Sequence, residues 1–237
     1  MADRQQKSSS GCGQAAERVL KRLDWRLFPR GDRGWSLLRE WMLPDCRSVL
    51  DVGCGDRASL IKLVPGIPYS VGVDASIPDQ GSDPEVHSEY KTMDIRLLAN
   101  EFAPTSFDCV VALDVIEHLS KEDGIRLLEA MESIASRNVI LLTPNGFLPQ
   151  PPALDNPFQE HLSGWTVDEF VERGYRVVGI NGWRPLRGSY AAIRWRPASF
   201  WWRLALLTQR FVSSRPRWAF HLLCLKDVGT AQGSTDP

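Results

Sequence analysis

The sequence predicts an α/β domain built on a mostly parallel sheet with helices on both faces. Short apolar runs typical of buried strands alternate along the chain with stretches of helical apolar spacing, and this alternation indicates a parallel sheet. The clearest run, Val49–Val52, stops at two closely spaced glycines, Gly53 and Gly55. A strand with this ending turns sharply into a helix, and the glycines let a ligand lie against the backbone.

The strands are predicted from short, mostly apolar runs, the pattern of strands that are covered on both faces. The predicted strands are Ser48–Val52, Tyr69–Val73, Phe107–Leu113, Val139–Leu142, Tyr175–Ile180 and Trp218–Leu225. Asp74 follows the second of them, and a carboxylate at that strand tip can accept hydrogen bonds from both hydroxyls of a ribose.

Helices are predicted before, between and after these strands. Apolar residues keep helical spacing through Lys121–Ser136. Thr166 and Glu169 form a capping box that opens a second helix, which stops at Gly174. Further helices are predicted at Ala15–Leu27, Trp35–Met42 and Ser199–Val212.

Two nucleoside cofactors compete for the glycine-rich turn. Residues 53–58, Gly-Cys-Gly-Asp-Arg-Ala, fit the dinucleotide fingerprint, which also has an acid about 20 residues further on. Against that cofactor, Asp51 stands two residues before the first glycine, where a carboxylate repels a pyrophosphate but suits the ammonium group of a methionine moiety. The Tyr-x-x-x-Lys spacing of short-chain dehydrogenases is absent after every tyrosine. An NAD(P)-dependent oxidoreductase or nucleotide-binding module is therefore the disfavoured alternative.

The next segments favour the methionine-type cofactor. Met93-Asp94-Ile95 precedes the third predicted strand, and Asp114 and Val115-Ile116-Glu117-His118-Leu119 follow it. This order resembles the class I S-adenosylmethionine-dependent methyltransferases, particularly the type 11/12 group with the ubiquinone-pathway and sugar O-methyltransferases. The resemblance covers residues 47–180 and, more loosely, the chain as far as Leu225. It implies a Rossmann-like seven-stranded sheet with an antiparallel last strand.

The resemblance also implies a role for each motif residue. The cofactor-binding set is Asp51, Gly53 and Gly55 for the methionine part, Asp74 for the ribose, Asp94 with Ile95 for the adenine, and Asp114 beside the sulfonium. Arg57 stands where many relatives carry a third glycine, which leaves the path of this loop open.

Two histidines are the candidate catalytic residues. A hydroxyl acceptor must lose a proton during methyl transfer, so a general base or a metal is needed. His118 follows the strand that faces the sulfonium and is suited to be the base, although a helix-entry role with a backbone hydrogen bond is an equal alternative. His161 lies in a loop where relatives place substrate-facing residues. His87 and His221 are expected to be structural.

The same histidines raise the question of a metal. The metal site of small-RNA 2′-O-methyltransferases and some quinone O-methyltransferases has the pattern Glu-x-x-Glu-His, followed by a downstream His. This chain resembles that pattern, with Asp114-x-x-Glu117-His118 and the later His161. Asp114 replaces the first Glu and shortens the reach by a methylene. Such ligands suit Mg²⁺ or Mn²⁺. A polar pocket without a metal is the favoured expectation, and a divalent metal is the alternative.

The methyl acceptor is expected to be an oxygen. Residues 143–146, Thr-Pro-Asn-Gly, are not the Asn-Pro-Pro-Tyr motif of adenine amino-group methyltransferases, and no cysteine follows a proline as in base C5 methylation. The favoured acceptor is thus a small molecule, a sugar or a lipid-linked intermediate, while nucleic acid is disfavoured. An N- or C-methyltransferase of the same fold and a catalytically silent binding module stay open.

Length and composition suit one α/β domain, and a cytoplasmic location is expected. The 237 residues are 43% hydrophobic and 24% charged, and the five cysteines form no Cys-x-x-Cys pair. Neither a leader sequence nor a membrane span is expected. The predicted organisation is a disordered tail (1–13), a helical N-terminal cap (14–46), the methyltransferase domain (47–226) and a second disordered tail (227–237).

Charge is distributed unevenly along the chain. From Arg173 to Lys226 there are ten Arg, one Lys and no acid; since the whole chain carries −1 and this stretch +11, the rest carries −12. The Trp-rich part, residues 181–217, is predicted to be a basic insertion. Either it packs as an ordinary helix, or it contacts an anionic acceptor or the surface of an anionic membrane.

Overall fold

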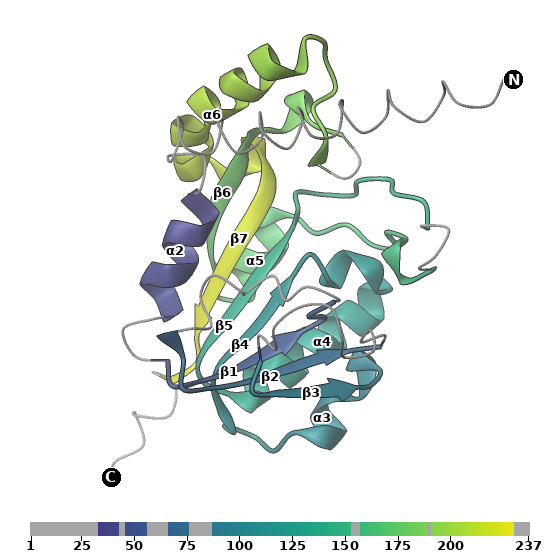
Figure 1. Ribbon diagram of the computed structural model, residues 1–237, viewed down its shortest axis with the longest axis vertical. Coiled ribbons are helices and arrows are strands. Elements are labelled where there is room, and N and C mark those ends of the chain that lie inside the picture. Colours follow the sequence, from purple (N-terminus) through teal and green to yellow (C-terminus); the bar gives the residue numbers. More distant parts are fainter. Residues whose placement is uncertain are drawn as a thin grey trace, which may run out of the picture. The chain divides into compact units, whose positions relative to one another are not determined.

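A seven-stranded sheet forms the core of the structure (Figure 1). The computed structural model describes residues 33–42, 46–55, 66–75, 87–152, 157–188 and 191–229. The strands are β1 (Ser48–Val52), β2 (Tyr69–Asp74), β3 (Glu89–Thr92), β4 (Phe107–Leu113), β5 (Ala135–Pro144), β6 (Arg176–Trp183) and β7 (Ala219–Asp227). Their order is β3-β2-β1-β4-β5-β7-β6, and β7 is antiparallel to both neighbours while the other pairs are parallel. The predicted Rossmann-like fold with an antiparallel last strand is confirmed.

One strand was not predicted, and one helix ends earlier than predicted. β3 was not predicted, because this four-residue edge strand has no buried residue and carries Glu89 and Lys91. The helix predicted through Ser136 ends at Ile134, and Ala135 already has extended backbone and pairs with Phe107 in the sheet. Helix and strand adjoin there without a loop, so no turn residue marks the boundary.

Helices cover both faces of the sheet. The longer ones are α2 (Arg33–Met42), α4 (Lys121–Ile134) and α6 (Ala198–Ser214), and the shorter ones are α3 (Leu98–Glu101) and α5 (Val167–Glu172). Single 3-10 turns are η3 (Ile95–Leu97), η4 (Ile116–His118), η5 (Pro157–Gln159), η6 (Arg184–Leu186) and η8 (Pro216–Trp218). The predicted capping box opens α5, where Thr166 and Glu169 each bond the other's backbone.

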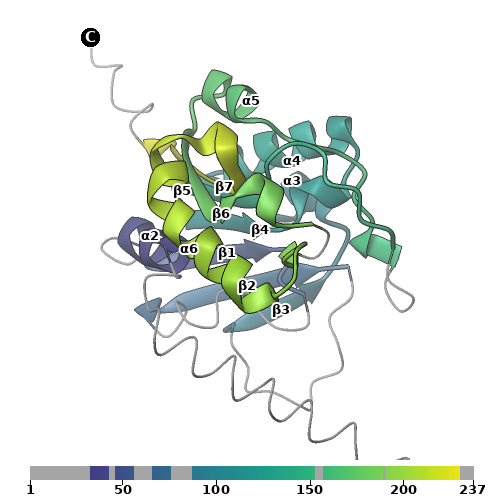
Figure 2. The same cartoon turned by 90° about the horizontal axis from the view of Figure 1, so that it is seen from above.

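The core is divided between the two faces. Leu37, Leu38, Trp41 and Met42 of α2 pack in one cluster against the sheet, and residues of α3, α4 and α5 pack in the other. Figure 2 shows α3, α4 and α5 on the face opposite α2. α6 packs beside the edge strand β6 (Figure 1). None of the described helices is both long and apolar enough to span a bilayer.

The sheet brings the predicted site residues to one edge. Asp74 ends β2 and Asp114 directly follows β4, and the carboxyl ends of neighbouring parallel strands share an edge. The antiparallel β7 begins at that edge, where His221 pairs with Pro144 at the end of β5. One histidine of the last strand is thereby placed beside the strand tips.

Some domain predictions fall outside the described residues. The tail at 1–13 and the helix Ala15–Leu27 lie in that part of the chain, as does most of the tail predicted at 227–237. Asp227 to Gly229 are described and bond into the sheet region: Asp227 pairs with Asn138, and the N–H of Val228 donates to the Arg137 carbonyl at 2.7 Å. β7 therefore includes Asp227, the residue at which the second tail was predicted to begin.

Candidate cofactor and acceptor site

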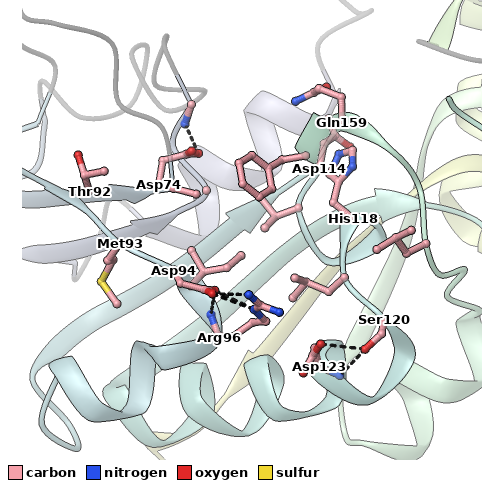
Figure 3. A pocket seen from close by; sticks show the side chains of 18 residues that line it. Asp74, Thr92, Met93, Asp94, Arg96, Asp114, His118, Ser120, Asp123 and Gln159 are labelled. Carbon is pink, nitrogen blue, oxygen red and sulfur yellow. Dashed lines mark hydrogen bonds and ion pairs between the residues drawn. The ribbon is translucent and has the colours of Figure 1, made fainter. Parts of the chain in front are cut away.

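A cavity of about 990 Å³ opens at the carboxyl edge of the parallel strands (Figure 3). This volume suits a nucleoside cofactor together with part of an acceptor. The predicted site residues that line it are Gly53, Gly55, Asp74, Asp94, Ile95, Asp114 and His118. The other two, Asp51 and His161, are buried beside it.

The two glycines after β1 have different reasons to lack a side chain. Both have left-handed backbone, with φ of +72° at Gly53 and +64° at Gly55. A Cβ on Gly53 would lie 2.5 Å from Val115 Cγ2, whereas a Cβ on Gly55 would meet no atom of the described residues within 4 Å. Gly53 thus allows close packing beneath the turn, and Gly55 leaves space in the cavity for a ligand.

Asp74 is fixed beside this turn. The Gly55 N–H donates to Asp74 Oδ2 at 2.9 Å, a bond that joins the turn after β1 to the end of β2 (Figure 3). A carboxylate has about four acceptor positions, and the two ribose hydroxyls predicted to bind Asp74 would each use one of them.

Asp94 is held by Arg96 at the start of η3. Its carboxylate accepts from the Arg96 N–H at 2.9 Å and from the guanidinium Nε at 2.9–3.0 Å (Figure 3). The guanidinium beside it lowers the pKa of Asp94. Ile95 lines the cavity next to this pair, so the wall expected to face the adenine combines one anion with apolar surface.

Asp51 lies beneath the glycine turn, not on the cavity wall. Its Oδ2 is 3.1 Å from His87 Nε2, and the two side chains are 2% and 0% exposed. Burial raises the pKa of Asp51. The predicted structural role of His87 agrees with this buried position.

Asp114 projects into the cavity from a strained position. Its backbone φ is +55°, and its N–H donates to the Leu142 carbonyl at 2.9 Å. His221 Nε2 lies 3.6 Å from Asp114 Oδ1, while Asn181 Nδ2 lies 2.6 Å from His221 Nδ1. An amide hydrogen directed at Nδ1 leaves the ring proton on Nε2, facing Asp114. Burial lowers the pKa of His221 to about 3, so the ring is neutral.

Three potential metal ligands converge beside Asp114. One donor atom each of Glu117, His118 and His161 lies within 4.8 Å of the others, and the two imidazole rings are T-shaped with centroids 4.8 Å apart. Glu117 is 2% exposed and its Oε2 accepts from Thr143 Oγ1 at 3.0 Å. Burial, with the nearby Asp114 carboxylate, raises the pKa of Glu117 well above its usual value.

Backbone carbonyls fix both histidine rings. His118 Nδ1 lies 2.9 Å from the Glu160 carbonyl, and His161 Nδ1 lies 2.8 Å from the Leu148 carbonyl. A carbonyl oxygen only accepts, so Nδ1 carries the proton and each Nε2 keeps its lone pair. Burial lowers the pKa of both histidines, which favours the neutral form that binds metals. A carboxylate and two oriented imidazoles fit a divalent cation.

The sequence did not single out every residue of the site. Asp114 takes the place of the first Glu in the metal pattern, yet the converging donors are those of the three later residues. The cavity lining that motif reading missed includes Ala75, Thr92, Arg96, Ser120 and Asp123. Their positions depend on how the loops fold over the strand tips, and no local spacing signals that.

Comparison with known proteins identifies the domain type. A family model described as a methyltransferase domain matches residues 14–181. The small RNA 2′-O-methyltransferase of Mus musculus is 27% identical over 156 residues, covering 58% of this chain and 40% of that protein. Its counterpart in Rattus norvegicus is 29% identical over 142 residues, covering 52% and 36%. The chain therefore spans at most 40% of the length of these curated relatives.

Solved structures share the fold at low sequence identity. The YcgJ protein of Bacillus subtilis matches with a TM-score of 0.51 at 15% identity, over 81% of this chain and 96% of that one. Phosphoethanolamine N-methyltransferase 2 of Haemonchus contortus, in complex with S-adenosyl-L-methionine, matches with a TM-score of 0.51 at 12% identity, over 82% and 51%. At these identities the likeness establishes the common fold.

Proposed function

Because the chain belongs to the class I S-adenosylmethionine-dependent methyltransferases, we propose that it methylates a hydroxyl oxygen, with a divalent cation held by Glu117, His118 and His161. S-adenosylmethionine is the methyl donor of this family. The convergence of the three donor atoms within 4.8 Å is the observation that carries the choice of a hydroxyl acceptor. A neutral amine needs no such help, whereas a hydroxyl must be made nucleophilic.

The proposed cofactor position uses the strand tips. Asp74 accepts from the ribose hydroxyls, the cavity wall at Asp94 and Ile95 faces the adenine, and the turn at Gly55 admits the methionine part. Asp114 then lies beside the sulfonium, where a carboxylate stabilises the positive charge of the donor. Asp51 contributes to this arrangement from below by supporting the turn.

The chemistry is an in-line displacement that depends on position. The acceptor oxygen attacks the methyl carbon as the bond from that carbon to sulfur breaks, and the hydroxyl proton is released to solvent. The enzyme therefore mainly aligns the two partners. When bound, a divalent cation would polarise the acceptor hydroxyl and lower its pKa. The chain supplies the neutral Nε2 atoms of His118 and His161, and the Glu117 carboxylate, on the Asp114 side of the cavity.

A ribose hydroxyl is the acceptor class that the relatives favour. Both curated relatives are small RNA 2′-O-methyltransferases, and the sequence arguments against DNA adenine and base C5 methylation do not bear on ribose. A sugar or lipid-linked hydroxyl remains the second candidate, since the basic stretch from Arg173 to Lys226 suits any anionic acceptor.

The test measures methyl transfer from labelled S-adenosylmethionine to a short RNA and to the same RNA made entirely of 2′-O-methyl nucleotides. We expect transfer to the first only, loss of transfer with EDTA, and recovery with Mn²⁺ or Mg²⁺. Glu117→Gln should lower the rate at least about 100-fold, since metal sites are sensitive to their ligands. Glu160→Gln, an exposed neighbouring acid, is the matched control.

Two results would separate the parts of this proposal. Transfer that resists EDTA and survives the His118→Ala/His161→Ala double variant removes the metal-assisted mechanism. Transfer to a sugar or lipid extract but not to RNA keeps that mechanism and replaces the acceptor class.

A further inference from the structure

The outer face of α6 carries large apolar side chains exposed to water. Phe200, Leu207 and Phe211 are 56%, 76% and 47% exposed. They are spaced seven and four residues apart, so they form one stripe along the helix. This stripe is separate from the cofactor cavity, which none of its residues lines.

The opposite face already anchors α6 to the sheet. Gln209 Nε2 donates to the Gly179 carbonyl at 2.9 Å, and Gln209 Oε1 accepts from the Gly182 N–H at 3.1 Å. A Cβ on Gly182 would lie 2.4 Å from the Ala205 carbonyl oxygen, so helix and strand are in close contact. Rotation of the helix to bury its outer stripe would break this contact, and the exposure of the stripe is therefore fixed by the fold.

Cations flank the stripe. Arg203 and Arg210 are exposed on α6, and at helical spacing both lie along one side of the apolar stripe. Of the elements that contact α6, β6, η6 and η8 contain no acidic residue, and β7 contains one, Asp227, at its far end. The surface is thus apolar along a line and cationic beside it, a combination that complements an apolar layer with anionic groups at its boundary.

The composition of the stripe favours lipid over the other anionic partners. RNA without defined sequence is bound by stacking its bases on aromatic rings, but the most exposed residue of the stripe, Leu207, is aliphatic. A second copy of the chain would place its own Arg203 and Arg210 against those of the first copy, and these like charges would repel each other. The N-terminal residues 14–33 carry six Lys or Arg against three acids. That segment is therefore also net positive and does not complement the arginines of α6.

The connection from α6 leads directly to the cavity edge. α6 runs through η8 into β7, and Asn145, which follows β5, donates its side-chain amide to the carbonyls of Pro216 and Arg217 at 3.2 and 3.0 Å. A partner on α6 would therefore lie near the edge of the sheet at which the cavity opens.

We propose that the outer face of α6 docks on the surface of an anionic lipid bilayer. Phe200, Leu207 and Phe211 enter the boundary between headgroups and acyl chains, and Arg203 and Arg210 contact the lipid phosphates. This docking is independent of the proposed function, because it uses none of the cofactor or metal-binding residues.

Co-sedimentation of the full chain with vesicles tests the proposal. We expect binding to vesicles of equal phosphatidylglycerol and phosphatidylcholine, weakening in high salt, and no binding to phosphatidylcholine alone. Arg203→Glu/Arg210→Glu should weaken binding at least about thirtyfold, since each cation near an anionic bilayer is worth a factor of about five. Arg39→Glu/Arg47→Glu, an equal charge change at exposed positions outside α6, should leave binding within about threefold of wild type.

A second variant separates the apolar stripe from the charges. Phe200→Gln/Leu207→Gln keeps every arginine and removes exposed side chains only, so it should fold and yet bind anionic vesicles about tenfold less well. Equal binding by this variant and wild type would reduce the contact to diffuse electrostatics and overturn the proposal. The proposal would also be overturned if the protein did not bind vesicles and instead bound RNA or dimerised, with that binding or dimerisation lost in the α6 variants.

Discussion

Asp51 and His87 form a buried pair, with Asp51 Oδ2 3.1 Å from His87 Nε2. The ring packs over the backbone of Gly72, where a Cβ would lie 2.6 Å from His87 Cδ2. The pair therefore ties the end of β1 to the segment that enters β3, across β2. It gives Asp51 a structural role directly beneath the glycine turn.

The first prediction concerns the stability that this pair contributes. Removing one partner of a buried hydrogen-bonded pair typically costs about 1–3 kcal/mol, because the other polar group is left buried without a partner. Asp51→Ala and His87→Ala should each lower the free energy of unfolding by that order. In urea unfolding, the double variant should lose less than the two single losses combined, with a coupling of about 0.5–3 kcal/mol. Strict additivity would mean that the two residues act separately.

The strands were predictable wherever burial is complete. Ser48–Val52 and Phe107–Leu113 were predicted with the bounds that β1 and β4 have, because both are mostly apolar segments buried in the middle of the sheet. β3 has no such run, since an edge strand leaves its side chains partly exposed. Periodicity detects burial, and therefore it misses a strand that pairs through backbone alone.

The cofactor side of the site was predictable for a related reason. Asp74 and Asp114 each stand immediately after a recognisable strand, and parallel topology brings such positions together. The pairing of Asp51 with His87, 36 residues later, depends on how the chain returns to the sheet. His161 reaches Glu117 through a loop in the same way, so neither contact has a local sequence signal.

The second prediction concerns the ribose contact. Asp74→Ala should weaken binding of S-adenosylhomocysteine by about 1.5–3 kcal/mol, the usual loss for hydrogen bonds to a charged group. Titration calorimetry measures this affinity directly. The affinity of Asp74→Asn should lie between those of Asp74→Ala and wild type. Thr92→Ala changes the same cavity wall without removing a charge and is the control. Wild-type affinity in Asp74→Ala, or tight NADH binding, would contradict the assignment.

The third prediction separates the two glycines of the turn. Gly53→Ala should destabilise the protein by about 1–3 kcal/mol through overpacking against Val115, in addition to the cost of left-handed backbone. Val115→Ala introduced with it should recover part of that loss. Gly55→Ala should cost only the backbone penalty of about 1–2 kcal/mol, but should impair S-adenosylhomocysteine binding. Denaturant unfolding and calorimetry on the three variants provide the readouts, and identical behaviour of the two glycine variants would count against this division of roles.

The last prediction distinguishes Asp114 from the metal ligands. A Glu-x-x-Glu-His pattern read literally makes Asp114 a ligand, whereas the converging donors are Glu117, His118 and His161. Asp114→Asn, which tolerates left-handed backbone, should therefore keep Mn²⁺ affinity within about threefold while impairing methyl transfer. Glu117→Gln should lower Mn²⁺ affinity about 10–100-fold, the usual effect of disturbing a metal site. Mn²⁺ binding can be followed by electron paramagnetic resonance without acceptor or cofactor, so the result does not depend on turnover. Equal loss of Mn²⁺ in both variants would place Asp114 in the coordination sphere and restore the four-residue pattern.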